Sequence, residues 1–160
     1  MPVFTPDTVK IDTQTAGDSP CGPATLLRFS DSGGLTQFGA FVEILPPGSR
    51  SSLCHWHAEE DEMVYMLDGE VSLYENGVAT PLRAGQAATF KAGVAVGHYL
   101  KNEGTAEARY LVIGTRARRD TVTYPDHDRK FTRDDDRGEV IYMTLDGQTG
   151  VGSAYDLPDA

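Results

Sequence analysis

The sequence predicts a single all-β domain, either a sandwich or a barrel, and three observations lead to that class. Its 160 residues suit one domain and are enough to bury a real core. The 17 glycines and 9 prolines recur every few residues, so there is little room for long helices. The apolar stretches between them are short and rich in β-branched and aromatic residues, as in strands.

Strands are expected where short apolar runs lie between turn signals. Residues 25–30 and 36–45 are separated by a turn that contains Gly33 and Gly34. Asp68-Gly69 predicts a hairpin between residues 62–67 and 70–75. The remaining expected strands, each next to a glycine or proline turn or a change in polarity, are 53–57, 87–90, 97–101, 108–115 and 139–145.

The chain divides into three parts by composition. Residues 1–35 are expected to form an N-terminal arm with the first strand, and residues 36–115 the barrel. Residues 116–160 are expected to form a charged C-terminal arm with one strand, 139–145. Seven basic and six acidic side chains lie within residues 116–137, which predicts a solvated, ion-paired segment. His127 lies in this segment between two acids and is expected to be a solvated surface histidine, with a site role as the alternative.

Charge and composition exclude several classes of function. The net charge of −10 disfavours a nucleic-acid partner. Because no apolar run approaches 18 residues, no membrane span is predicted. Residues 1–19 lack the basic start and apolar stretch of a signal peptide, so the cytoplasm is the expected location. Two cysteines, Cys21 and Cys54, cannot build a disulfide framework or an all-cysteine metal site.

One cluster of residues has the pattern of a metal site. His55 and His57 are two residues apart, so on a strand both imidazoles face the same side. Glu62 opens the next strand and can return its carboxylate to that face, while His98 can add a third imidazole from a later strand. Such nitrogen and oxygen donors suit a divalent first-row transition metal. The alternative is two surface histidines, but Leu53 shares their face and favours an inward direction.

The spacing of these residues resembles the two motifs of the cupin superfamily. The first motif is matched by Gly48, six residues, His55, one residue, His57, four residues, Glu62, six residues and Gly69. The second is matched in altered form by Gly85, five residues, Lys91-Ala92-Gly93, and then by His98, three residues and Asn102. Lys91 stands where the family usually has proline, and the gap between Gly93 and His98 is two residues longer than usual.

The resemblance covers about residues 40–113 and implies a double-stranded β-helix, the jelly-roll barrel of cupins. It also implies His55, His57, Glu62 and His98 as ligands of one divalent metal ion per chain, with zinc, iron, manganese and nickel all possible. The arms look like those of bacterial cupins, some of which are named by similarity as sugar-phosphate isomerases. Since fold does not fix function, that name carries no activity by itself.

The expected pocket is mostly apolar around this charged centre. Alternation places Val64, Met66 and Leu100 on the inward face, where they either contact a ligand or form plain core. Such a pocket binds a small organic molecule through its oxygen atoms. Lys91 and Arg50 are candidates for contacting a phosphate, although their spacing does not mark a clamp. The sequence shows no evident general base beside the ligands.

The opposite face of the same strands is also apolar. Alternation directs Trp56, Met63 and Tyr65 outward, where an uncovered patch would be unusual on a monomer. The N-terminal arm or a second subunit can cover it, and because cupins commonly pair through such faces, a homodimer is expected. Cys54 is expected to pack in this outer layer, away from the metal.

Three classes of function remain open. The first is a small-molecule metalloenzyme, which the cupin resemblance allows to be an oxygenase (such as a dioxygenase), a decarboxylase or an isomerase. The second is a non-catalytic, metal-dependent binding protein or sensor, and the third is a metal-stabilised barrel that contacts a partner. Among enzymes, a neutral or singly charged ligand ranks above a sugar phosphate, because a net charge of −10 slows the approach of anions.

Overall fold

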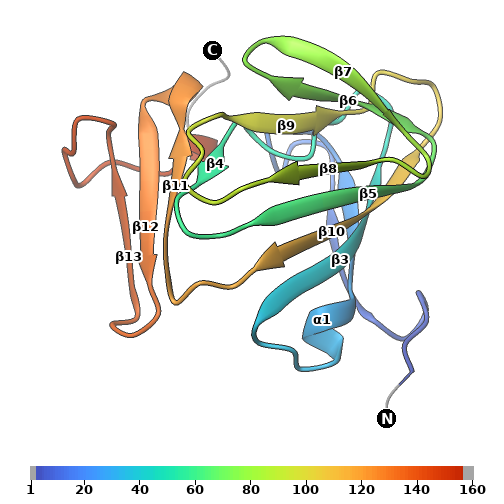
Figure 1. Ribbon diagram of the computed structural model, residues 1–160, viewed down its shortest axis with the longest axis horizontal. Helices are drawn as coiled ribbons and strands as arrows, with labels where there is room; N and C mark the ends of the chain where they lie inside the picture. The colour runs from blue at the N-terminus through green and yellow to red at the C-terminus, as the bar shows by residue number, and fades with distance from the viewer. Residues whose placement is uncertain (1–2, 157–160) are drawn as a thin grey trace.

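The largest element of the fold is a six-stranded antiparallel sheet with the order β1-β2-β3-β10-β5-β8 (Figure 1). The computed structural model describes residues 3–156. The strands of this sheet are β1 (Lys10–Gln14), β2 (Ala24–Arg28), β3 (Phe38–Leu45), β5 (Glu62–Asp68), β8 (Ala87–Phe90) and β10 (Ala108–Thr115). A short helix, α1 (Phe29–Ser32), connects β2 to β3.

Two smaller sheets complete the fold. The first has the order β7-β6-β9, from β6 (Glu70–Glu75), β7 (Val78–Arg83) and β9 (His98–Lys101). The second has the order β13-β12-β11-β4, from β4 (Trp56–His57), β11 (Arg119–Tyr124), β12 (Arg129–Asp134) and β13 (Glu139–Met143). Figure 1 shows β11, β12 and β13 standing beside the barrel, which they join through β4. Two 3-10 turns, Pro125–His127 and Ala154–Asp156, complete the regular structure.

The barrel encloses one main core, and the all-β barrel predicted from the sequence is confirmed. Alternate residues of β5 and β10 point inward, including Val64 and Met66 on one strand and Tyr110 and Val112 on the other. A second, smaller core joins the two arms to the barrel; its residues are Cys21, Leu53, Val122, Tyr124 and Ala154. Both arms therefore pack on the barrel next to the segment that carries His55.

The hairpin between β5 and β6 depends on a glycine. Gly69 has a φ of 77°, and an added Cβ would lie 3.1 Å from Ala108 Cα and from the Glu107 carbonyl oxygen. A side chain here would meet backbone atoms that cannot easily move. The Asp68-Gly69 turn expected from the sequence therefore also serves the packing of β5 against β10.

The arms hold more strands than the sequence analysis expected. The C-terminal part contains β11 and β12 in addition to β13, where only residues 139–145 were expected to form a strand. The N-terminal arm contributes β1, and the strand expected over 25–30 ends at Arg28, before α1. β1 and β12 each hold a single apolar residue and therefore show no apolar alternation. In β11 only Val122 and Tyr124 alternate on the buried face, within a charged stretch. Pairing with a neighbouring sheet edge supplies the backbone hydrogen bonds that hold these strands.

The outer face of β5 is partly uncovered. Tyr65 and Leu67 are 41% and 48% exposed, while Met63 and Trp56 are half-buried against this chain itself. Cys21 and Cys54 are not joined in a disulfide. Within residues 3–156 there is no helix whose length and hydropathy would let it cross a membrane.

Candidate metal centre

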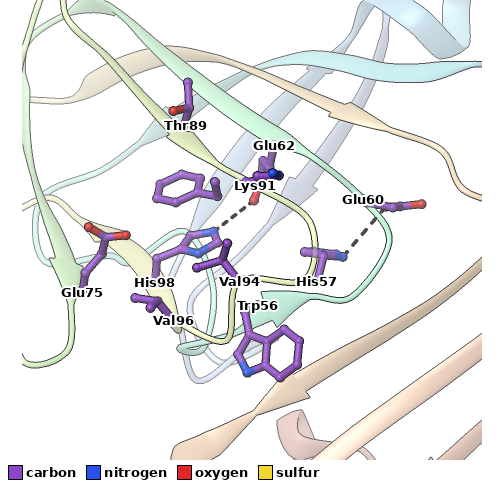
Figure 2. A pocket seen from close by; sticks show the side chains of 11 residues that line it. Trp56, His57, Glu60, Glu62, Glu75, Thr89, Lys91, Val94, Val96 and His98 are labelled. Atoms are coloured by element: carbon purple, nitrogen blue, oxygen red, sulfur yellow. Dashed lines mark hydrogen bonds and ion pairs between the residues drawn. The ribbon is translucent and has the colours of Figure 1, made fainter.

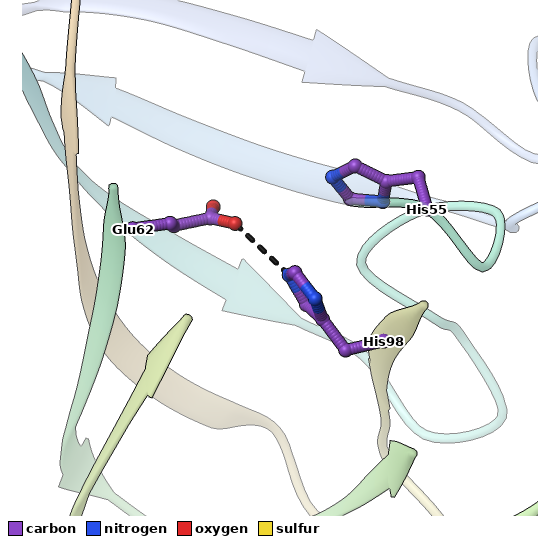
Figure 3. Close-up of side chains that lie close together, drawn as sticks. All are labelled: His55, Glu62 and His98. Carbon is purple, nitrogen blue, oxygen red and sulfur yellow. Dashed lines mark hydrogen bonds and ion pairs between the residues drawn. The ribbon is translucent and has the colours of Figure 1, made fainter. Parts of the chain in front are cut away.

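His57, Glu62 and His98 meet on the wall of one cavity (Figure 2). His57 ends β4, Glu62 begins β5 and His98 begins β9, so three separate strands deliver them. His55 lies directly before β4 and joins the same group from the other side. One donor atom from each of His55, Glu62 and His98 lies within 4.8 Å of the other two (Figure 3). The structure thus brings these three predicted ligands together.

Backbone hydrogen bonds fix the two histidines His55 and His98 relative to each other. The His98 amide donates to the His55 carbonyl at 2.9 Å, and the His55 amide donates to the His98 carbonyl at 3.3 Å. His55 Nδ1 lies 2.9 Å from the Leu53 carbonyl oxygen, an acceptor, so this nitrogen carries the proton. Burial lowers the pKa of His55 to about 4. His55 is therefore neutral at pH 7, with Nε2 available as a ligand.

His98 and Glu62 are oriented by their surroundings. The His98 ring is buried and stacks on Phe90 with centroids 3.5 Å apart. Its Nε2 lies 3.1 Å from Glu62 Oε2, the contact drawn in Figure 3. Burial acts to raise the pKa of Glu62, but the hydrogen bond from His98 and the nearby histidines hold it below its ordinary value. Glu62 is thus an anionic donor at neutral pH.

His57 has a different environment from the other three. Its Nδ1 lies 2.6 Å from Asp120 Oδ2 and 3.9 Å from Glu60 Oε2, and its ring centroid is 5.1 Å from that of His55. Burial acts to lower the pKa of His57, but the Asp120 carboxylate outweighs it and raises the pKa. Because Asp120 accepts the Nδ1 proton, Nε2 is the nitrogen left for a metal, as in carboxylate–histidine–metal arrangements.

The two carboxylates near His57, those of Asp120 and Glu60, are themselves held by hydrogen bonds. Asp120 is 4% exposed, and its Oδ1 accepts the Glu59 amide proton at 2.9 Å. Glu60 accepts a hydrogen bond from Arg133 Nη2 at 2.7 Å. His57, Glu60 and Asp120 have metal-ligand spacing. Since Asp120 and Glu60 are engaged with their neighbours, we interpret this group as the support of His57.

The four predicted ligands fit a divalent transition metal by their donor chemistry. Three imidazoles and one carboxylate are the ligand types that iron, manganese, nickel and zinc accept. Three of the donors are already gathered, and the fourth is oriented by a buried carboxylate.

Two cavities border the gathered donors. The Glu43 cavity, about 190 Å³, is lined by His55, Glu62 and His98 together with Glu43, Val64, Leu100, Tyr110 and other residues. The Lys91 cavity, about 180 Å³ and drawn in Figure 2, is lined by His57, Glu62 and His98 together with Lys91, Trp56, Glu75 and others. A small molecule in either cavity lies beside the donors.

The residues expected to contact substrate are distributed unevenly. Val64 and Leu100 line the Glu43 cavity, and Lys91 lines its own cavity beside His98. Met66 is fully buried in the main core. Arg50 lines a separate cavity with Cys21, Tyr99, Lys101, His127 and others, so the fold does not bring it to the donor cluster.

Sequence reasoning missed two polar residues of the Glu43 cavity. Glu43 and Tyr110 are 5% and 0% exposed, which corrects the expectation of an apolar pocket without a further carboxylate. Burial raises the pKa of Glu43 to about 7, although the Tyr110 hydroxyl acts to lower it. A signal was present, because Glu43 alternates with Phe41 and Leu45 and so shares their inward face.

Asp120 was missed as well, and no local pattern could have found it. It lies in the charged stretch that was expected to be solvated, 63 residues from His57. Only the pairing of β11 with β4 brings it to the site. The expectation of a solvated segment is wrong for Asp120, whereas most ion pairs of the stretch do lie at the surface.

Comparison with known proteins agrees with this geometry. Residues 41–114 match the Cupin domain family, Cupin_2. A crystal structure named as a sugar phosphate isomerase from a cupin superfamily, from Silicibacter pomeroyi, is 32% identical with a TM-score of 0.83, over 92% of this chain and 95% of that one. A putative sugar phosphate isomerase from Acidithiobacillus ferrooxidans is 25% identical with a TM-score of 0.81, over 94% and 97%.

A curated protein also matches part of the chain. The Oxalate-binding protein of Thermotoga maritima is 35% identical over 69 residues, which is 43% of this chain. The match spans 54% of that protein's length, about half. The structural matches, by contrast, include both arms as well as the barrel.

Proposed function

Since this chain belongs to the cupin superfamily, we propose that it is a metalloenzyme that acts on a small organic molecule. In this proposal His55, His57, Glu62 and His98 hold one divalent transition metal ion. The observation that carries it is the set of three donor atoms within 4.8 Å of one another at a cavity wall. When bound, the ion supplies a Lewis acid that polarises substrate oxygens.

The protein's own residues define what the substrate meets. Val64 and Leu100 give the Glu43 cavity an apolar side that excludes water from the reacting atoms. The Leu53 carbonyl and Asp120 accept the Nδ1 protons of His55 and His57, so Nε2 of each is the nitrogen that would bind a metal. His98 Nε2 donates to Glu62 and would lose that proton when a metal binds. An oxygenase, a decarboxylase and an isomerase all fit this description. A non-catalytic binding protein is the alternative that a turnover assay separates from them.

A sugar-phosphate isomerase is the second candidate. The two structures similar over more than nine-tenths of this chain carry that name. Lys91, the one basic residue in the lining of its cavity, lies there with His98 and supports an anionic ligand. Against it, the same lining holds three glutamates, Glu60, Glu62 and Glu75. We therefore rank an unphosphorylated ligand first.

Arginines from the arms do not change this ranking. Arg28, Arg116 and Arg133 line a third cavity that shares Glu62 and His57 with the donor cluster. Each is paired with a carboxylate, from Asp12, Asp31 and Glu60 respectively. Their charge is therefore balanced within the protein and does not favour a phosphate dianion.

Elemental analysis of protein purified without chelators is the first test. We expect one divalent transition metal ion per chain. At a metal concentration a hundredfold above the dissociation constant, the free energy of unfolding should be about 2.7 kcal/mol higher than without metal. Chelation should lower the melting temperature accordingly. A protein that contains no metal, and binds none on titration, contradicts the proposal.

Binding of paired sugars and sugar phosphates to the metal-loaded protein separates the two candidates. If phosphorylated compounds bind tighter and Lys91→Ala removes the difference, the isomerase-like candidate replaces the first. Arg50→Ala is the matched control, because Arg50 lines a different cavity. Turnover of the tighter-binding class then distinguishes an enzyme from a binding protein.

We also propose that the protein is a homodimer. The exposed Tyr65 and Leu67 on β5 support a partner copy on this face. Light scattering at micromolar concentration should give about twice the chain mass of 17.3 kDa. Tyr65→Glu should shift the mass toward that of one chain, and a wild-type mass near 17.3 kDa contradicts the dimer.

A further inference from the structure

Glu43 and Tyr110 line the same cavity as three residues of the donor cluster, His55, Glu62 and His98. They are directly paired on neighbouring antiparallel strands, Glu43 on β3 and Tyr110 on β10. Glu62 lies in the same sheet, on β5, which pairs with the other edge of β10. The cavity therefore brings two further polar groups close to the predicted metal ligands.

The surroundings of this pair are apolar. Phe41 and Leu45 flank Glu43 on the inward face of β3, and Val112 follows Tyr110 on that of β10. The Tyr110 hydroxyl is buried, and its neighbouring acceptor is the Glu43 carboxyl, whose pKa it acts to lower. The two groups do not form a hydrogen bond of good geometry, and no other residue between 3 and 156 forms one with this hydroxyl. Burying a polar group without a partner is unfavourable, so buried polar groups in proteins are nearly always bonded. A phenol and a carboxyl at the surface of a cavity are thus expected to bond to what fills it.

The pair has a defined hydrogen-bonding character. Above its pKa of about 7, Glu43 is a carboxylate that only accepts hydrogen bonds. The tyrosine hydroxyl, in contrast, is available as a donor. The group that satisfies both at once donates one hydrogen bond and accepts another. An alcoholic hydroxyl does this, whereas an ammonium group has no acceptor and a second carboxylate meets repulsion from Glu43.

We propose that Glu43 and Tyr110 form a subsite for an alcoholic hydroxyl of the substrate. The substrate is then a small hydroxy acid or hydroxy ketone, with its carboxylate or carbonyl oxygen toward the donor cluster. This inference rests on the proposed function, because the metal is what holds the other end of the molecule. A cavity of about 190 Å³ limits the substrate, or the part that enters, to a few carbon atoms.

The test is calorimetric binding of two matched probes, 3-hydroxypropionate and propionate, which differ by one hydroxyl. Metal-loaded wild-type protein should bind 3-hydroxypropionate about tenfold more tightly, which is typical of one hydrogen bond to a charged group. Tyr110→Phe should reduce this preference to near one and leave propionate affinity unchanged. Glu43→Gln removes a negative charge, so it should raise the affinity for both anions. Because its amide oxygen accepts only a neutral hydrogen bond, it should also lower the preference for 3-hydroxypropionate. Thr89→Val, in the Lys91 cavity, should keep the full preference.

The outcomes separate this inference from the proposed function. Metal content and melting temperature are measured for each variant before any probe is added. If metal binds normally but the wild type shows no preference for 3-hydroxypropionate, or Tyr110→Phe keeps it, the hydroxyl subsite is wrong and the metal centre stands. If no metal binds to the wild type, the proposed function itself fails. If the variants lose stability but keep the preference, the pair is only structural and the inference is overturned.

Discussion

The barrel interior and the β11–β13 sheet carry charge in opposite ways. In the interior, Glu43 and His98 are buried among apolar side chains and have few partners. At the open end of β11 and β12, surface arginines pair with aspartates, Arg118 with Asp136 and Arg119 with Asp134. Exposed pairs contribute little to stability, whereas a buried charge is costly unless it is compensated. Under the proposed function, the buried titratable groups of the barrel would be retained because the site uses them.

The two regions meet at His57. Asp120 belongs to the charged arm, but its side chain is buried against this histidine. Arg133, from β12 of the same arm, forms an ion pair with the neighbouring Glu60. One acid of the arm thus behaves like the interior charges. Four measurements test whether interior and surface charges differ in their effect on metal affinity and stability.

Loss of an interior ligand should have the largest effect. If four donors share about 10–16 kcal/mol of metal binding equally, His98→Ala should weaken the affinity about 100- to 1000-fold. His127→Ala, which changes a histidine of the arm, should leave the affinity unchanged. Metal titration with a competing chelator measures both. Equal effects of the two substitutions would remove the distinction between the regions.

The buried carboxyl of Glu43 should make stability depend on pH. Its pKa rises on folding from 4.5 to about 7 because of burial, so the folded state binds more protons than the unfolded state in this window. Stability from this group therefore falls as pH rises from 4.5 to 7, by about 3 kcal/mol in total. Glu43→Gln should flatten the curve and be more stable than the wild type at pH 8. Denaturant unfolding across this range checks it, and parallel curves for the two proteins contradict it.

The acid at the boundary should have an intermediate effect. Asp120→Asn keeps the size of the side chain but removes the charge that orients His57, so metal affinity should fall about 10–100-fold. Asp134→Asn, on the neighbouring strand and at the surface, is the matched control. An affinity unchanged by Asp120→Asn would mean that His57 does not depend on the arm.

Surface pairs should have the smallest effect. Arg118 is 77% exposed and pairs with Asp136 at the end of the β11–β12 hairpin. Arg118→Ala should change the unfolding free energy by less than about 1 kcal/mol. Urea unfolding with and without added salt measures it, and a loss of several kcal/mol would show that the arm depends on this pair.

The sequence alone predicted the features that depend on nearby residues. His55, His57 and Glu62 lie within eight positions, so a strand and a turn are enough to bring them together. Asp120 reaches His57 only through the pairing of β11 with β4, and Tyr110 reaches Glu43 only through that of β10 with β3. Long-range pairing of this kind leaves no mark in local spacing.

Arg50 shows that closeness in sequence can also mislead. It is five residues from His55, yet its segment bridges Lys101 and lines a cavity away from the donors. The strands β1 and β12 were missed because each holds a single apolar residue and gives no apolar alternation. In β11 the alternation of Val122 and Tyr124 was a signal, but it lies within a charged stretch that was expected to be solvated. Backbone pairing with a neighbouring strand decides their structure, and composition cannot reveal that.

Paired backbone hydrogen bonds fix the two backbone segments that carry His55 and His98 relative to each other. If the proposed metal binds here, it should therefore order little of the backbone, and its affinity should carry a small entropic penalty for the protein. A calcium ion should bind poorly at such a site, because it prefers more numerous oxygen ligands at longer distances.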